Sequence, residues 1–275
     1  MMRPERTFPP RRIPVRRRPP VNGRFMIGAM GVSAVDMAEA LARIDGRIRS
    51  GRPAYVCVSN LRTALLSQKD EAFCRIQNQS FMTLPDGMPL VWYAWLAGRR
   101  NVTRVTGPDL MARLLEVSPA RRYSHYFFGD TEDTLSKIAS VVRRKYGRVV
   151  IKGMRSPPFR PLRPSETEEY IEEINALRPS LVWVGLGAPK QELWMADVIG
   201  RIRSAVLVGV GAAFRFLIGE YHHPPTLVQD CGLEGLCWRF GRRPLRTLRR
   251  YAGVLPAYGW LVAKMLARRT LGRTG

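Results

Sequence analysis

The chain has 275 residues, 45% of them hydrophobic, which is enough to bury one large core and excludes a wholly disordered protein. Its formal net charge is +23, and most of the excess lies at the two ends. Residues 1–24 hold eight arginines and one acid, whereas residues 238–275 hold nine arginines and one lysine but no acid. Ends of this kind favour phosphate-rich partners such as anionic lipid, nucleic acid or a diphosphate substrate.

The first 22 residues are rich in arginine and proline and lack an apolar core, so we expect a disordered basic tail and not a signal peptide. No apolar stretch reaches the roughly 20 residues that a membrane-spanning helix needs. The best candidate, residues 252–266, contains Pro256 and Lys264. We therefore expect a protein that touches a membrane without crossing it. The four cysteines show no C-x-x-C spacing, which is typical of reduced thiols in a cytoplasmic compartment.

From Phe25 to Gly219, short runs of β-branched and aromatic residues alternate with longer stretches of helical periodicity. The runs predict strands at 54–59, 123–129, 148–152, 181–185 and 205–209, with weaker ones near 25–29 and 81–84. Ser165 and Glu168 form a predicted capping box at a helix start, and a further helix is predicted after Asp130. Apolar strands that alternate with helices favour an α/β fold with a parallel sheet covered on both faces.

This pattern divides the chain into three parts. We predict a disordered tail over residues 1–22, an α/β core over 23–220 and a basic helical C-terminal appendage over 221–275. In the appendage, short helices are expected in which tryptophan and tyrosine interleave with arginine. That mixture suits a membrane interface or a nucleic-acid backbone, and a solvated cationic face is the plain alternative.

Four loops that follow predicted strands carry small or polar residues. They contain Asn60, Asp86-Gly87, the segment GLGAPKQE (185–192) and the segment GVGA (209–212). In a parallel sheet the ligand lies at the carboxyl ends of the strands, and glycines ahead of a helix let backbone approach a phosphate. Taken singly, each loop also has an ordinary interpretation. Asp-Gly is commonly a turn, and neither glycine loop matches a complete nucleotide-binding motif.

Together and in order, these segments resemble the WecG/TagA/CpsF family of bacterial glycosyltransferases from about Phe25 to about Tyr251. Besides the Asn60 loop, the resemblance rests on LPDGMPLVW (84–92), RVTGPDLM (104–111), FFGD (127–130), VWVGLGAPKQELW (182–194), VGVGAAFRFLIG (208–219) and GLEGLCWRF (232–240). It implies a Rossmann-like fold whose C-terminal appendage helps complete the site and meets the membrane. It also implies transfer of an N-acetylmannosamine-type sugar or a related hexose from a UDP donor to a polyprenyl-diphosphate-linked acceptor, with inversion.

The resemblance gives roles to residues at matching positions. Asp86 corresponds to the family's proposed catalytic base and Arg104 to a functional arginine. The substrate-binding positions that it implies are Asn60, Gly187, Gln191, Glu192, Arg239, Arg246 and Arg249. Departures near the expected substrate face include Val58, where many relatives have threonine, and Arg215, which replaces the usual aspartate.

The chemistry expected from the residues agrees with these roles. An inverting transfer needs one carboxylate as general base, and arginine can balance the charge of a departing diphosphate. The sequence contains no Asp-x-Asp, so we expect no metal and no cofactor beyond the UDP-sugar donor. The expected location is the inner face of the bacterial plasma membrane, in cell-surface polysaccharide biosynthesis. The expected partners are the UDP-sugar, the lipid-linked acceptor and the anionic membrane surface. No nucleic-acid partner is expected, and the formation of a homo-oligomer stays an open question. Alternatives are a basic nucleic-acid-binding α/β protein and a sugar-nucleotide-binding relative without activity.

Overall fold

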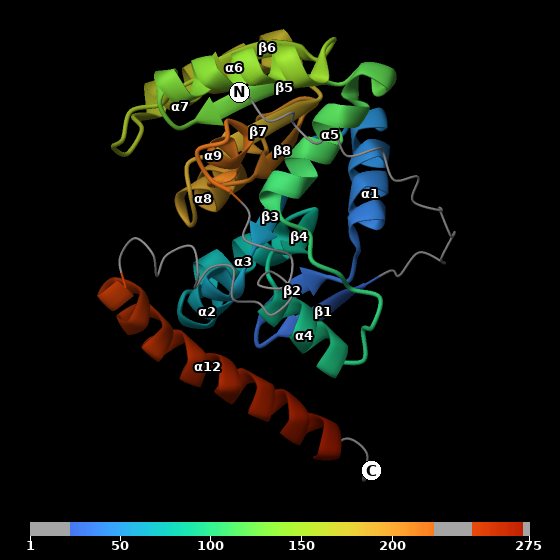
Figure 1. The fold of residues 1–275 in the computed structure, drawn as a ribbon, viewed down its shortest axis with the longest axis vertical. Helices are drawn as coiled ribbons and strands as arrows, with labels where there is room; N and C mark the ends of the chain where they lie inside the picture. The colour runs from blue at the N-terminus through green and yellow to red at the C-terminus, as the bar shows by residue number, and fades with distance from the viewer. Residues whose placement is uncertain (1–22, 223–243, 272–275) are drawn as a thin grey trace, which may run out of the picture.

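A computed structural model of the chain describes residues 23–222 and 244–271, with described side chains over 254–267 in the second range. Its centre is a parallel six-stranded sheet in the order β4-β3-β8-β7-β5-β6 (Figure 1). The strands are β3 (Ala54–Ser59), β4 (Met82–Pro85), β5 (Ser124–Gly129), β6 (Val150–Arg155), β7 (Leu181–Gly185) and β8 (Val206–Gly209). The α/β class that the alternation of strands and helices predicts is therefore confirmed.

Helices cover both faces of the sheet because its central strands carry apolar residues on both sides. One face packs against the buried sides of α1 (Met37–Arg49), α5 (Gly107–Arg121), α6 (Glu132–Tyr146) and α9 (Ala213–Leu217). The other face packs against α7 (Pro164–Leu177), α8 (Lys190–Val198) and part of α3 (Glu71–Gln79). Trp183 of β7 lies wholly buried in the first layer, and its indole donates to His125 of β5 at 2.9 Å.

A third apolar cluster lies beyond the β4 edge of the sheet. It joins the antiparallel hairpin of β1 (Arg24–Ile27) and β2 (Met30–Ser33) to α2 (Leu61–Lys69) and α4 (Met88–Leu96). The long helix α12 (Pro244–Leu271) runs along the outside of α2 and α4 and buries Leu261 in this cluster (Figure 1). Helix α12 is thus packed against the rest of the molecule beyond the β4 edge of the sheet.

Several predicted boundaries need correction. Strand β2 was not predicted, and β6 runs to Arg155 instead of ending at residue 152. Helix α7 begins at Pro164 and not after a Ser165 cap, because Glu166 accepts a hydrogen bond from the Arg163 backbone N–H at 2.7 Å. In the appendage, the described part is one helix of 28 residues in place of the expected short helices.

No helix in the described ranges is long and apolar enough to cross a membrane.

Candidate functional site

Asp86 lies directly after β4, between that strand and the start of α4. Its backbone N–H donates to the carbonyl of Ser59, the last residue of β3, at 2.8 Å. The loop turns at Gly87, whose φ of +112° is a conformation that other residues rarely adopt. Asp86 is partly exposed. The hydrogen bond to β3 and the turn therefore fix the backbone of Asp86 at the carboxyl edge of the sheet, as the sequence predicts.

Arg104 reaches the same edge from a different part of the chain. Residues 101–106 cross from α4 to α5, and the Val105 N–H donates to the carbonyl of Pro85 at 2.9 Å. Val105 is buried in the core, whereas Arg104 itself is partly exposed. Because Pro85 precedes Asp86, the structure places Arg104 on a segment that runs beside the Asp86 loop.

Gly107 continues this segment toward the end of β8. It is the first residue of α5, whose N-cap is Thr106, and a Cβ at its position would lie 3.0 Å from the carbonyl oxygen of Val210. A side chain there would push the α5 start away from the β8–α9 loop. In the sequence, Gly107 stands out only as part of the RVTGPDLM segment that carries the family resemblance. Its role in bringing two site loops together depends on a tertiary contact, for which the Thr-Gly-Pro-Asp sequence gives no separate signal.

Gln191 and Glu192 lie beneath the glycine loops and not on their surface. Gln191 is 3% exposed, and its side-chain oxygen accepts from the Gly211 N–H at 3.0 Å. Its Nε2 donates to Oε1 of Glu192 at 3.0 Å. Glu192 is wholly buried, and its second carboxylate oxygen has no hydrogen-bond partner in the described residues. Burial raises the pKa of Glu192 above its ordinary value, because it disfavours the charged form.

These contacts assign Gln191 and Glu192 a supporting position in this structure. The two hydrogen bonds that link Glu192, Gln191 and Gly211 hold the loop after β8 against the start of α8. Helix α8 itself follows the loop after β7. Gly187, by contrast, has a φ of +77° and open space where a Cβ would stand, so its backbone borders an accessible edge. Of the three substrate-binding residues predicted in this loop, Gln191 and Glu192 are buried and Gly187 is partly exposed.

Asn60 follows β3 and is exposed at the same edge of the sheet. Its side-chain oxygen accepts from the backbone N–H groups of Arg62 and Thr63, at 3.0 and 3.4 Å, which makes it the N-cap of α2. One end of the side chain is therefore committed to the helix, and its amide nitrogen is the end left to a substrate within the described part of the chain. Val58, the departure from threonine, is buried in β3.

The appendage residues are only partly placed. Arg239 lies outside the described residues; Arg246 and Arg249 belong to α12, with side chains outside the described set. The described part of α12 does reach the site helices, since the Tyr258 hydroxyl donates to the carbonyl of Pro89 at 2.8 Å. Pro89 is the second residue of α4, three positions after Asp86. Sequence reasoning missed this tyrosine, because an aromatic in a basic helix reads as a surface residue.

Arg215, the other departure, forms an ion-pair network at the far end of the same edge. Its guanidinium donates to both carboxylate oxygens of Asp130, at 2.9 and 2.5 Å, and to Glu220 at 2.6 Å. Burial alone would raise the pKa of Asp130, but the hydrogen bonds from Arg215 and from Thr131 hold it below its ordinary value. The pair therefore ties α9 to the loop after β5, with Asp130 ionised.

Comparison with known proteins agrees with this arrangement. A family model described as "Glycosyl transferase WecG/TagA/CpsF family" matches residues 25–272. The chain is 24% identical over 211 residues to an N-acetylglucosaminyldiphosphoundecaprenol N-acetyl-β-D-mannosaminyltransferase from Bacillus spizizenii, covering 77% of this chain and 79% of the relative. The protein of the same name from Bacillus subtilis strain 168 matches to the same extent. With the motif loops gathered at one edge of a parallel sheet, the chain belongs to the WecG/TagA/CpsF family of glycosyltransferases.

Proposed function

We propose that this chain transfers an N-acetylmannosamine-type sugar from a UDP donor to a polyprenyl-diphosphate-linked acceptor, with inversion at the anomeric carbon. Family membership and the names of the two Bacillus relatives support the substrate classes. The observation that carries the chemistry is the position of Asp86. Asp86 is partly exposed at the carboxyl edge of the sheet, on a loop held to β3 and flanked by the segment that carries Arg104.

In the proposed reaction the Asp86 carboxylate accepts the proton of the acceptor hydroxyl as that oxygen attacks the anomeric carbon. A carbon–oxygen bond forms on one face of the sugar while the bond to the β-phosphate oxygen breaks on the other. UDP leaves with the electron pair, and the growing negative charge needs a positive partner. Arg104 is proposed to supply it, since a guanidinium binds phosphate in a bidentate manner.

We assign this charge compensation to arginine and not to a divalent metal. The support is the absence of Asp-x-Asp from the sequence together with the place of Arg104 beside the Asp86 loop. Transfer should then continue in an excess of chelator. A strict requirement for added metal would contradict the assignment.

The proposed location is the inner face of the plasma membrane, which the protein would contact without spanning it. Helix α12 supports it, because its sequence holds five arginines and one lysine and no acid. Its described side chains include Leu255, Trp260 and Leu266, which are 60%, 59% and 44% exposed. Exposed apolar side chains on a helix of this basic composition suit an anionic bilayer surface. Binding to anionic vesicles tests this location.

The substitution Asp86→Asn tests the catalytic assignment. It keeps the size of the side chain but removes its basicity, so kcat should fall by a factor of about 10² or more, the usual contribution of a general base. KM should change little. Asp36→Asn is the matched control: Asp36 caps α1 through the Glu39 N–H, and asparagine caps equally well. Transfer by Asp86→Asn at a rate close to that of the unmodified chain would show that another group is the base.

A further inference from the structure

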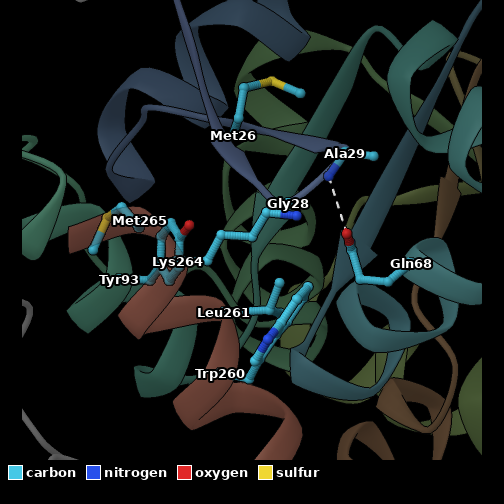
Figure 2. Close-up of a pocket in the computed structure, with 9 residues that line it drawn as sticks. All are labelled: Met26, Gly28, Ala29, Gln68, Tyr93, Trp260, Leu261, Lys264 and Met265. Carbon is cyan, nitrogen blue, oxygen red and sulfur yellow. Dashed lines mark hydrogen bonds between the residues drawn. The ribbon is translucent and has the colours of Figure 1, made fainter. Parts of the chain in front are cut away.

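A cavity of about 540 Å³ lies between the β1–β2 hairpin and α12, away from the loops described above. The turn of the hairpin, the end of α2, the middle of α4 and one face of α12 enclose it (Figure 2). The lining residues are Met26, Gly28, Ala29, Gln68, Tyr93, Trp260, Leu261, Lys264 and Met265. Its volume lies within the range of roughly 300–1,000 Å³ that is usual for small-molecule sites.

The hairpin side of the cavity is rigidly built. The side-chain oxygen of Gln68 accepts from the Ala29 N–H at 3.0 Å, and its nitrogen donates to the carbonyl of Ile27 at 3.0 Å. Gly28 has a φ of +59°, and a Cβ there would collide with the Gln68 side chain. The turn is thus held against α2 by an amide and a required glycine, which gives the cavity one fixed wall.

The lining has the chemistry of an amphiphile site with an anionic end. Two methionines, a leucine and two aromatic rings provide apolar walls, and Met26 and Trp260 leave 52% and 59% of their surfaces exposed. Among the described residues of the lining, the single charged group is Lys264, whose ammonium lies 4.7 Å from the centre of the Trp260 ring. In Figure 2 the lysine side chain extends over the cavity toward the hairpin turn. An exposed apolar cavity whose described lining holds one cation and no acid suits a hydrocarbon attached to a phosphate.

The position of the cavity relates it to the catalytic edge. Helices α2 and α4 begin directly after their N-caps, Asn60 and Gly87, and both lead from the edge to the cavity, so distances along them are counted from these caps. Tyr93 is six residues along α4 and Gln68 eight residues along α2, or about 9 and 12 Å at 1.5 Å per residue. A molecule whose sugar reacts at Asp86 and whose lipid points outward could span that distance with a diphosphate. Tyr258 fixes α12 to Pro89 at the start of α4, so the cavity and the Asp86 loop are held by the same contact.

We propose that this cavity binds the first isoprene units of the polyprenyl-diphosphate acceptor, with Lys264 facing the diphosphate. The assignment rests on the proposed function for the identity of the acceptor. The sugar-nucleotide donor has no hydrocarbon to fill such walls, and the cavity lies outside the loops assigned to it. The methionines suit a flexible prenyl chain because their unbranched side chains adapt to irregular shapes.

Direct binding tests the proposal without requiring turnover. Farnesyl diphosphate is the probe, and inorganic diphosphate and farnesol each lack one half of it. Lys264→Gln should weaken farnesyl diphosphate binding by about tenfold, and Met265→Trp, which fills the cavity, by at least as much. Met265→Trp should leave the weak binding of inorganic diphosphate unchanged, whereas Lys264→Gln should weaken it as well, because the ammonium that faces the diphosphate is lost. Lys145→Gln is the matched control, because Lys145 also lies over an aromatic ring, that of Tyr146, but on α6. It should bind farnesyl diphosphate like the unmodified chain.

Two results would overturn the assignment. One is equal affinity of Lys264→Gln, Met265→Trp and the control for farnesyl diphosphate, when thermal unfolding curves show that all three are folded. The other is loss of binding to phosphatidylglycerol vesicles in Lys264→Gln with farnesyl diphosphate binding intact, which would make the cavity a bilayer contact. The two proposals can fail separately, because the binding assay needs no turnover. Even in a chain without transferase activity, the affinities of Lys264→Gln and the control for farnesyl diphosphate either differ or do not.

Discussion

At the scale of single residues, the polar side chains that follow the sheet strands fall into two sets: Asn60 and Asp86 are accessible, whereas Gln191 and Glu192 are buried. Asp86 was expected at the carboxyl edge because it follows a strand in a parallel sheet, and the structure places it there. Gln191 and Glu192 also follow a strand, but they turn inward beneath the loops. Polar residues that follow a glycine loop in the sequence are expected to face a ligand. Only the packing of α8 against the sheet shows that they hold the loop from below.

Glu192 gives a testable consequence of that burial. Because its folded-state pKa is raised, the folded protein keeps a proton that the unfolded chain releases above the ordinary pKa of 4.5. Stability should therefore fall as pH rises from 4.5 through the folded-state pKa, with a slope of about 1.4 kcal/mol per pH unit inside that window. Glu192→Gln keeps an oxygen that accepts from Gln191 and removes the titration. Its stability relative to the unmodified chain should rise with pH in denaturant unfolding.

Glu192→Leu is the contrasting variant. It removes the acceptor of the Gln191 Nε2 and should destabilise the fold by about 1–3 kcal/mol, the cost of a buried donor without a partner. Glu192→Gln should retain most transferase activity, whereas the leucine variant should lose much of it as the Gly211 loop loosens. If the stability of Glu192→Gln follows the unmodified chain at every pH, the carboxyl group does not titrate in the way that we describe.

At the scale of elements, the sequence predicted the buried strands well. Strands β3 and β7 match their predicted residues, because continuous apolar runs bounded by turns leave little choice in a sheet covered on both faces. Strand β2 was missed because it is four residues long, contains Gly31 and follows a turn without an Asn-Gly signature. Its strand character comes from pairing with β1.

Helix α12 was the other difference at this scale. Pro256 predicts a break, since proline lacks the N–H of the helix ladder. The structure instead continues the helix through it, with Pro256 exposed, and packs the following turns through Tyr258 and Leu261. Tertiary contacts with α2 and α4 therefore outweigh a local rule, and contacts at that range leave no local pattern in the sequence.

The exposed leucines of α12 lead to a prediction for membrane binding. Replacing Leu255 and Leu266 by glutamine removes apolar surface that would enter the bilayer, worth about 1.5–3 kcal/mol for each fully buried leucine. Affinity for anionic vesicles at physiological salt should fall at least tenfold in flotation assays. Neither residue lines the cavity described above, so cavity binding is unaffected.

Leu193→Gln is the control for this experiment, because Leu193 is 47% exposed on α8. Its vesicle affinity should equal that of the unmodified chain. Duplex DNA at the same salt should compete poorly for the protein. Vesicle binding that is indifferent to the α12 leucines, or DNA binding tighter than vesicle binding, would remove α12 as the membrane contact.

At the scale of the whole molecule, the basic C-terminal helix and the site loops lie on connected parts of the fold. The described core carries the family loops at one edge of its sheet, while the cationic C-terminal helix lies across the two helices that start from that edge. An enzyme that joins a soluble donor to a lipid-linked acceptor needs both parts in reach of each other. The resemblance implies that the C-terminal appendage helps complete the site, but the helices on which α12 packs could not be predicted from sequence, because that packing depends on contacts far apart in the chain.

The most direct test of the account is the product of the reaction itself. The purified chain is given a panel of UDP-sugars with N-acetylglucosamine linked to a polyprenyl diphosphate, and the anomeric configuration of the new linkage is determined by NMR. We expect transfer of one N-acetylhexosamine, with a configuration opposite to that of the donor. Retained configuration would contradict the single displacement at Asp86, and no transfer from any UDP-sugar would contradict the proposed function.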